Sequence, residues 1–261
     1  MQAGTLLDAD GDPEFMTSLA RGLAVMRCFA ERARPIRIAE ITRETGLSRP
    51  AVRRCLHTLV RLGYAEQVGQ SYVLRPKMLA FGYAYLSSSP LVQRAQPLLD
   101  ALRDQIGESC SLGVREDDEV YYVGRAEASR IMSIALRAGS RLPLYATSMG
   151  RVLLSGQPLP EQQAYLRRTH LVALTEKTET DPKSLLRIFS TVAEQGYAIV
   201  DQELEAGLRS VAVPIRQGGQ VVAALNIGTQ AARLSMADLR SRLLPALRRV
   251  ASDLSRGGLF A

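Results

Sequence analysis

Residues 36–63, which read IRIAEITRETGLSRPAVRRCLHTLVRLG, predict two short amphipathic helices separated by a turn at Gly46. Gly46 suits a left-handed C-cap for the first helix. In the second helix, Ser48 suits the N-cap and Pro50 suits the first turn, where its missing N–H is not needed. Apolar residues recur along the second helix at the helical period and predict one buried face: Val52, Cys55, Leu56, Leu59 and Val60.

Basic side chains lie on the opposite side of this second helix. Helix-turn-helix proteins place the start of such a helix in the major groove, where an arginine fork meets guanine or a phosphate bidentately. The sequence therefore predicts a helix that reads double-stranded DNA, and the alternative is an ordinary helical hairpin with a basic, solvated face. The residues expected to contact DNA from this helix are Ser48, Arg49, Arg53, Arg54 and His57.

Two strand-like runs, residues 64–68 and 71–74, follow around a turn at Gly69 and predict a β-hairpin. The segment would then be a winged helix-turn-helix. Because the tip of the wing holds no Lys or Arg, we expect the wing to be mainly structural, with Arg75 and Lys77 contacting backbone phosphate instead.

A further helix upstream is expected to complete a three-helix core, with Ser18 as its cap. The residues expected to face that core are Leu19, Leu23, Met26 and Phe29.

Positive charge is concentrated in this part of the chain. Residues 17–77 contain 12 Lys and Arg against 4 Asp and Glu, whereas residues 1–16 contain four acids and no base. The whole chain of 261 residues has a net charge of +7, so most of its basic excess lies where a phosphate-binding surface would need it. We interpret the acidic, broken 1–16 segment as a mobile leader and not as a signal peptide.

Composition limits the other classes of protein. A length of 261 residues with 46% hydrophobic residues fits two domains. Cys28, Cys55 and Cys110 offer no CxxC pair, so we expect core thiols in a cytoplasmic protein. With His57 and His170 as the two histidines, we expect no metal site and no cofactor. No apolar run approaches the roughly 20 residues of a membrane span, so we expect no membrane partner.

After the wing, an apolar helix is predicted over 78–89, with a stop signal at Ser87-Ser88-Ser89-Pro90. A second copy of the chain would cover this helix, and a two-fold homodimer would also set paired recognition helices for a palindromic operator. The alternative is that the helix caps the following domain. The expected organisation is a leader (1–16), a winged helix-turn-helix domain (17–77), a linker and dimerisation helix (78–89) and an effector-binding domain (90–261).

Beyond Pro90 the pattern changes to a mixture of strands and helices, typical of an α+β domain with an antiparallel sheet and helices on one or both faces. Strands are predicted at 109–115, 120–125, 131–137, 197–201, 210–216 and 221–227. Helices are predicted at about 91–107, from near Ser148, and at 160–168, 183–195 and 235–256.

The run from Tyr145 to Arg151, YATSMGR, places hydroxyls and free backbone N–H groups at a helix start, which favours a carboxylate. Arg137 and Arg141 lie just upstream and are candidates to pair with an anionic group. These residues predict a small-acid effector site.

The chain resembles the IclR family of bacterial transcriptional regulators, and within it the subgroup that controls aromatic-acid catabolism through the β-ketoadipate pathway. Four separated motifs in one order carry the resemblance: MTSLARGLAVMRCF, GLSRPAVRRCLHTLVRLGYA, RLPLYATSMGRVLL and VDQELEAGLRSVAVPI. The resemblance implies a winged N-terminal domain, a dimerising linker helix and a C-terminal GAF-like effector domain. It also implies a homodimer or a dimer of dimers, and RNA polymerase is a further candidate partner.

In the family, effector contacts come from the loop before the 148 helix and from later strands. The matching positions here are Ser148, Met149, Ser210 and Asn226, with Asp201 and Glu203 nearby, and Arg151 joins them from the loop itself. The alternatives are that Ser148 only caps its helix, that Arg151 is a surface charge and that Asn226 faces solvent. Many relatives carry Asp or Ser where this chain has Val200, which puts a polar contact from that position in doubt.

The resemblance makes β-ketoadipate the first choice of effector, because two arginines near one loop suit a dicarboxylate; protocatechuate, 4-hydroxybenzoate or a muconate are the alternatives. An enzymatic C-terminal domain is a rival class, but we find no GxSxG elbow, no metal cluster and no His close to a catalytic Ser or Asp. We therefore expect no catalytic residues. A purely architectural DNA-binding protein is the other rival, and it would have no saturable small-molecule site.

Overall fold

The computed structural model describes residues 12–30, 34–128 and 136–256, and the chain divides into two compact units, Met1–Ala84 and Tyr85–Ala261. The boundary lies within helix α4 (Leu79–Ser88), in the region where the sequence predicts a linker helix. Most of the expected leader and most of the strand predicted at 131–137 lie outside the described residues.

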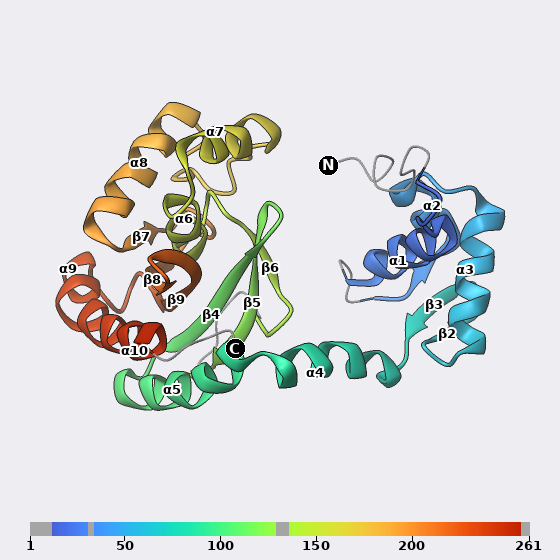
Figure 1. Ribbon diagram of the computed structural model, residues 1–261, viewed down its shortest axis with the longest axis horizontal. Coiled ribbons are helices and arrows are strands. Elements are labelled where there is room, and N and C mark those ends of the chain that lie inside the picture. Colours follow the sequence, from blue (N-terminus) through green and yellow to red (C-terminus); the bar gives the residue numbers. More distant parts are fainter. Residues whose placement is uncertain (1–11, 31–33, 129–135, 257–261) are drawn as a thin grey trace. The chain divides into compact units, whose positions relative to one another are not determined.

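The first unit is a three-helix core with a small antiparallel sheet of order β1-β3-β2 (Figure 1). The hairpin predicted after the second helix of the motif is present as β2 and β3, and β1 adds a short strand that the sequence did not predict. The elements are α1 (Thr17–Ala30), β1 (Ile36–Arg37), α2 (Ile38–Thr45), α3 (Arg49–Arg61), β2 (Ala65–Val68), β3 (Ser71–Leu74) and the short 3₁₀ helix η2 (Pro76–Met78).

Helix α1 faces the core with a side that only partly matches the prediction, because Phe29 is buried and Met26 packs against the core as predicted, but the two leucines do not. Val25, Cys28 and Phe29 are buried, whereas Leu19 and Leu23 are 57% and 50% exposed. Val25, Cys28 and Phe29, at positions i, i+3 and i+4, form the buried stripe of the helix. At 3.6 residues per turn, Leu19 and Leu23 lie outside this stripe. The expectation that these two leucines fill the core was therefore wrong.

The helix-turn-helix itself follows the sequence closely. Gly46 ends α2 with φ of 70°, a left-handed conformation that glycine adopts without steric cost. The Ser48 hydroxyl accepts a hydrogen bond from Ala51 N at 3.4 Å and caps α3. Val52, Leu56 and Leu59 are buried in the shared core of the unit, so one side of α3 is committed to packing.

The second unit is built on a six-stranded antiparallel sheet of order β6-β5-β4-β9-β8-β7. Five strands fall where the sequence predicts them, and β6 was not predicted. The strands are β4 (Ser109–Glu116), β5 (Glu119–Ala126), β6 (Arg141–Pro143), β7 (Ala198–Asp201), β8 (Leu208–Gln217) and β9 (Gln220–Gln230).

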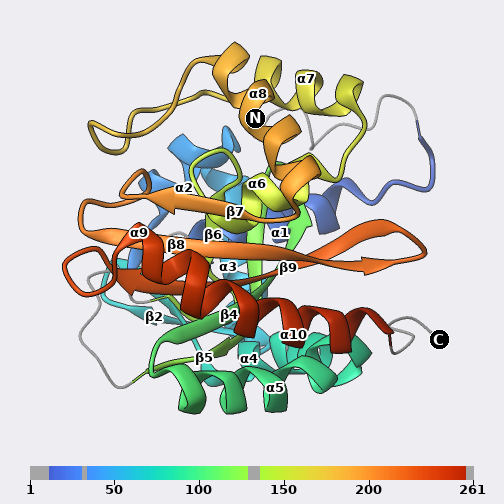
Figure 2. The same ribbon diagram turned by 90° about the vertical axis from the view of Figure 1, so that its left-hand side faces the viewer.

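Helices cover both faces of this sheet, so the α+β prediction is confirmed (Figure 2). One face packs against α5 (Pro90–Ile106) and α10 (Leu244–Arg256), and α6 (Ser148–Ser155) packs on the other. Two helices pack outside α6, α7 (Leu159–Arg168) and α8 (Pro182–Gln195). The long C-terminal helix predicted at 235–256 is interrupted, because a short helix α9 (Met236–Asp238) and a π-helical turn (Leu239–Leu243) precede α10.

Each face of the sheet has its own apolar layer. Cys110, Leu112 and Ile227 lie in the layer beneath α5 and α10, whereas Tyr122 and Ala224 lie in the layer that α6 joins. Strand residues alternate between the two layers, as an extended backbone requires. Among the described residues, no helix is long and apolar enough to cross a membrane, and no group of His, Cys, Asp and Glu is arranged to hold a metal ion.

Candidate functional site

The basic side of α3 is exposed. The side chains of Arg49, Arg53, Arg54 and His57 project from the surface opposite the core, and none forms an ion pair or side-chain hydrogen bond with another described residue. A solvated guanidinium with five free donors is available to guanine or phosphate. The structure therefore presents these predicted DNA-contacting residues together on one helix face, while Ser48 serves as the helix cap beside them.

Arg75 and Lys77, the predicted phosphate contacts, differ in their surroundings. Arg75 is exposed, and its backbone N–H donates to Tyr64 O. The Lys77 ammonium donates to Leu62 O, the C-cap carbonyl of α3, at 3.0 Å and lies 4.6 Å from the centre of the Tyr64 ring. Lys77 thus stabilises the C-terminal end of α3. A phosphate contact from Lys77 stays a prediction.

In the second unit, the predicted anion-binding loop leads directly into α6. Thr147, not Ser148, caps this helix, because the Thr147 hydroxyl accepts from Gly150 N at 3.1 Å. Gly150 lies so close to the preceding loop that a Cβ there would be 2.1 Å from Leu144 O. The start of α6 is consequently buried against the sheet, with Ser148 and Met149 inside.

Arg151 is buried and paired, so the alternative that it is a surface charge was wrong. Its Nη1 and Nη2 donate to the Glu203 carboxylate at 2.7 and 2.5 Å, and its Nε donates to Tyr145 O at 2.9 Å. The two side chains are 4% and 12% exposed. This bidentate pair joins α6 to the loop after β7, two segments 52 residues apart in the sequence.

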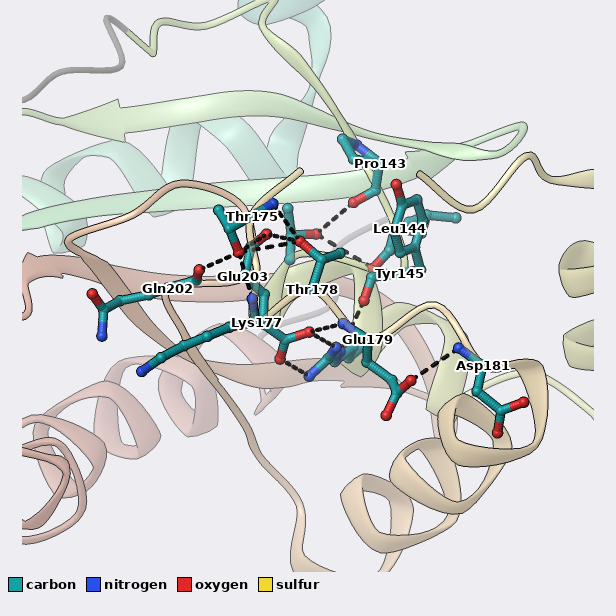
Figure 3. Close-up of polar contacts among 12 residues, drawn as sticks. Pro143, Leu144, Tyr145, Thr175, Lys177, Thr178, Glu179, Asp181, Gln202 and Glu203 are labelled. Atoms are coloured by element: carbon teal, nitrogen blue, oxygen red, sulfur yellow. Dashed lines mark hydrogen bonds and ion pairs between the residues drawn. The ribbon is translucent and has the colours of Figure 1, made fainter. Parts of the chain in front are cut away.

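The loop that carries Glu203 is itself held by a third segment. Figure 3 shows Glu179 N donating to the Glu203 carboxylate, at 2.9 Å, and Thr178 Oγ donating to the Glu203 carbonyl, at 2.6 Å. The Thr175 hydroxyl donates to Gln202 O at 2.8 Å. The predicted residues Arg151 and Glu203 therefore bind one another at the centre of a hydrogen-bonded cluster, and effector contact from either stays a prediction.

Asp201 lies next to this cluster and is also paired. Its carboxylate accepts from Arg209 Nε at 2.5 Å and from Lys177 Nζ at 3.0 Å. The Arg209 guanidinium lowers the pKa of Asp201 to about 2, with a smaller contribution from Lys177. The carboxylate is thus ionised and partnered.

The two arginines upstream of the loop have different surroundings. Arg137 is exposed, and its backbone N–H donates to Ser140. Arg141 lies on β6, where its Nη1 donates to Glu119 at 3.0 Å and its guanidinium lies 5.9 Å from the centre of the Tyr121 ring. The sequence argument for a dicarboxylate held by this pair therefore has no support in the described geometry.

A polar row on the sheet joins two predicted effector residues, Ser210 and Asn226, to Ser111 and Arg125, which the sequence analysis missed. Ser111 of β4 is the register partner of Arg125 on β5 and of Asn226 on β9. All three lie on the face that α6 covers, and Ser210 shares that face because Ala212, two residues along β8, pairs with Asn226. Asn226 is 8% exposed, so the alternative that it faces solvent was wrong.

Three atoms of this row are buried without a hydrogen-bond partner in the described part of the chain: Arg125 Nε, Arg125 Nη2 and Asn226 Oδ1. Ser148 Oγ, on the helix that packs on this face, is in the same condition. Met149 lies beside the row, since its Sδ would be 2.9 Å from a Cβ on Gly113, two residues along β4 from Ser111. Buried polar atoms are normally bonded, so a set of orphans marks a place where a ligand or water supplies the partner.

A winged helix with a free arginine face, followed by a domain whose sheet carries a buried polar row, defines a DNA-binding regulator with a separate sensing domain. The chain belongs to the IclR family: residues 18–69 match the IclR helix-turn-helix domain, and residues 83–256 match the bacterial transcriptional regulator IclR C-terminal domain. It is thus a DNA-binding transcriptional regulator. These families and the relatives below are regulators, not enzymes.

The particular relatives are informative. The chain is 50% identical over 246 residues to the Pca regulon regulatory protein of Pseudomonas putida, covering 94% of this chain and 84% of that protein. It is 33% identical to the p-hydroxybenzoate hydroxylase transcriptional activator of Acinetobacter baylyi, covering 92% and 91%. Among solved structures, an IclR homologue from Microbacterium hydrocarbonoxydans complexed with 4-hydroxybenzoate matches with a TM-score of 0.76 and 25% identity, covering 91% and 97%.

Proposed function

We propose that this regulator controls genes for aromatic-acid catabolism of the protocatechuate type and answers to a small carboxylic acid, with β-ketoadipate as the first candidate. The observation that carries the proposal is the 50% identity, over nearly the whole chain, to a regulator named for the Pca regulon. The buried polar row of the second unit supports a ligand in that domain, because its orphan donors match an anion.

We propose that the chain binds its operator as a homodimer. A two-fold pair of α3 helices would meet two half-sites of a palindromic operator, and the solvated arginines supply direct contacts to base edges. Helix α4 is the proposed dimer contact, because its side chains Leu79, Phe81 and Tyr83 are exposed and apolar within the described chain. A dimer of dimers would extend the same arrangement.

Effector control would operate through linkage. An acid that binds one arrangement of the subunits more tightly than another changes their populations, and so changes how well two α3 helices fit the operator. A coupling of about 1–3 kcal/mol corresponds to roughly 5- to 150-fold in DNA affinity. This range is enough to switch promoter occupancy.

The proposal is tested by fluorescence anisotropy with DNA from upstream of the catabolic genes nearest this chain's own gene. We expect nanomolar to subnanomolar binding of the operator, much weaker binding of scrambled DNA, and a shift in operator affinity when β-ketoadipate is added. Isothermal titration calorimetry of the same full chain should show saturable heat. Absence of both heat and shift with β-ketoadipate, protocatechuate, 4-hydroxybenzoate and a muconate would remove the proposed effector class.

A second candidate effector is 4-hydroxybenzoate. It is favoured by the solved relative that holds this acid, since that structure matches nearly the whole of the present chain. A competition titration distinguishes β-ketoadipate from 4-hydroxybenzoate. The acid that is the effector should displace the other acid and should shift operator affinity at a lower concentration.

A further inference from the structure

Arg125 is a buried cation whose charge is only partly compensated. Its side chain is 8% exposed, and within the described chain its carboxylate neighbour is Glu127, whose Oε1 lies 3.8 Å from Nη2. That distance is beyond hydrogen-bond range, and Glu127 is itself 57% exposed. Because a buried charge without a close partner is costly, a bound anion at this point would relieve the cost.

The free part of the guanidinium has a definite geometry. Nη1 donates to Ser111 Oγ at 3.0 Å, whereas Nε and Nη2 are buried without a hydrogen-bond partner among the described residues. Nε and Nη2 are adjacent donors along one edge of the planar group, and this edge meets a carboxylate through two parallel bonds. Ser111 thus holds the fork in place and leaves a bidentate edge open.

Neutral polar groups lie on the same face of the sheet as this edge. Asn226, next along the row, has a buried Oδ1 without a partner in the described chain, and Ser148 Oγ is in the same condition. Tyr122 lies on the same face against Asn226, and burial raises the pKa of its phenol well above the usual value, so the hydroxyl stays a neutral donor. These groups suit a ligand that carries a hydroxyl or carbonyl besides its carboxylate.

We infer that Arg125 anchors the carboxylate of the effector through Nε and Nη2, with Ser111 fixing the guanidinium. Asn226 and Ser148 then hold a second polar group of the same ligand. This inference rests on the proposed function, because it assigns the contacts of a small-acid effector to residues outside the arginines that the sequence favoured. It also assigns Glu127 a competing role, as the carboxylate nearest to the open edge.

The experiment is calorimetric titration of the full chain with 4-hydroxybenzoate, protocatechuate and β-ketoadipate, followed by the methyl ester of the acid that binds best. Arg125→Lys keeps the charge but loses the fork, and should weaken binding of the acid about tenfold; Arg125→Met should weaken it about 100-fold. The ester should bind wild type about as weakly as the acid binds Arg125→Met. Glu127→Gln removes the competing carboxylate and should tighten acid binding about two- to fivefold.

Arg216→Lys is the matched control, because Arg216 is an exposed arginine of the same sheet whose guanidinium bonds only to Gly219 O in the described chain, and acid affinity should not change. Thermal unfolding without ligand shows whether each variant is folded, and the Lys and Gln variants keep the test open if Arg125→Met unfolds. A wild-type chain that binds none of the acids removes the proposed effector. A wild type that binds, with Arg125→Lys or the ester equally tight, overturns this inference alone.

Discussion

The arginines of α3 and Arg151 of the second unit carry the same group in opposite surroundings. On α3, Arg49, Arg53 and Arg54 are exposed and have no side-chain partner among the described residues. In the second unit, Arg151 is 4% exposed and bound to Glu203 through both terminal nitrogens. A guanidinium in water costs little to keep free, whereas a buried one must be paired. The first kind is available for a partner, and the second holds the fold.

Arg125 belongs to neither kind. Its side chain is nearly as buried as that of Arg151, at 8% against 4% exposed, yet two of its nitrogens are as free of hydrogen bonds as those on α3. The difference between Arg125 and Arg151 is therefore the clearest guide to function in the second unit: full pairing indicates structure, and an open buried fork indicates a ligand.

Of the proposed substitutions, replacing Arg151 should change the free energy of unfolding most. Arg151→Met leaves the Glu203 carboxylate buried with only Glu179 N as a bonded partner in the described chain, so the free energy of unfolding should fall by about 3–5 kcal/mol. Guanidinium denaturation of the full chain, followed by far-UV circular dichroism, measures the loss.

The control is an arginine whose ion pairs are exposed. Arg168 bonds Asp118 and Glu161, but its side chain is 39% exposed, so Arg168→Met should cost about 0–1 kcal/mol. If both substitutions cost the same small amount, the buried pair is not the structural clamp that its geometry indicates.

Removing Arg53 should affect DNA binding and leave stability unchanged. Because the Arg53 side chain bonds no other described residue, Arg53→Ala should cost about 1–3 kcal/mol of operator affinity and relax the preference for operator over scrambled DNA. Arg61→Ala, in the last turn of the same helix, is the matched control and should leave sequence preference intact. Unchanged operator affinity for Arg53→Ala would mean that α3 does not read the groove.

The contrast also shows what the sequence could predict. The fold of the first unit could be predicted from the sequence, because the helix caps, the turn and the apolar period in residues 36–63 all indicate the same two helices. The structure confirms the bounds of these helices and the wing. The strands of the second unit could also be predicted, because their hydrophobic pattern is typical of strands. In helix α1, Met26 and Phe29 were assigned correctly and Leu19 and Leu23 were not, because a short helix with leucines on several sides has more than one acceptable stripe, and packing selects between them.

Arg125 could not be found by alternation. Counted from Val120 and Tyr122, a regular strand would turn Arg125 toward the layer beneath α5. The register between β4 and β5 instead shifts at Leu112/Gly113, so β5 contains one extra residue and Arg125 is turned to the other face. The pairing of Arg151 with Glu203 was equally hidden, since it depends on tertiary contact between segments far apart in the chain.

Replacing Lys77 should change DNA affinity less than replacing Arg53. This substitution tests whether an ammonium that already contacts Leu62 O and the Tyr64 ring still contacts DNA. If the ammonium reaches phosphate, Lys77→Ala should weaken operator and scrambled DNA alike and reduce the salt slope of log K by about 1. Anisotropy titrations across a range of salt concentrations measure the slope. An unchanged slope with lower thermal stability would assign Lys77 only to the Leu62 carbonyl and the Tyr64 ring.

Asp201 lies between the two extremes of the comparison, because its ion pairs with Arg209 and Lys177 leave it 29% exposed. Arg209 lowers the pKa of Asp201 from 3.8 to about 2 in the folded chain, so the unfolded chain takes up the proton first as the pH falls. The stabilisation is complete above about pH 4 and is lost as the pH falls through about 2. Asp201→Asn should therefore be less stable than wild type near neutral pH, and the difference should shrink between pH 4 and pH 2.

Urea denaturation at closely spaced pH values from 6 to 2 measures this difference. Asp253→Asn, on an exposed position of α10 without an ion pair in the described chain, should give a profile parallel to wild type. A constant difference between Asp201→Asn and wild type across the whole range would show that ionisation of the Asp201 carboxylate contributes nothing to stability. A difference that closes as the pH falls would show that the ion pair of Asp201 with Arg209 stabilises the fold, as the pair of Arg151 with Glu203 does.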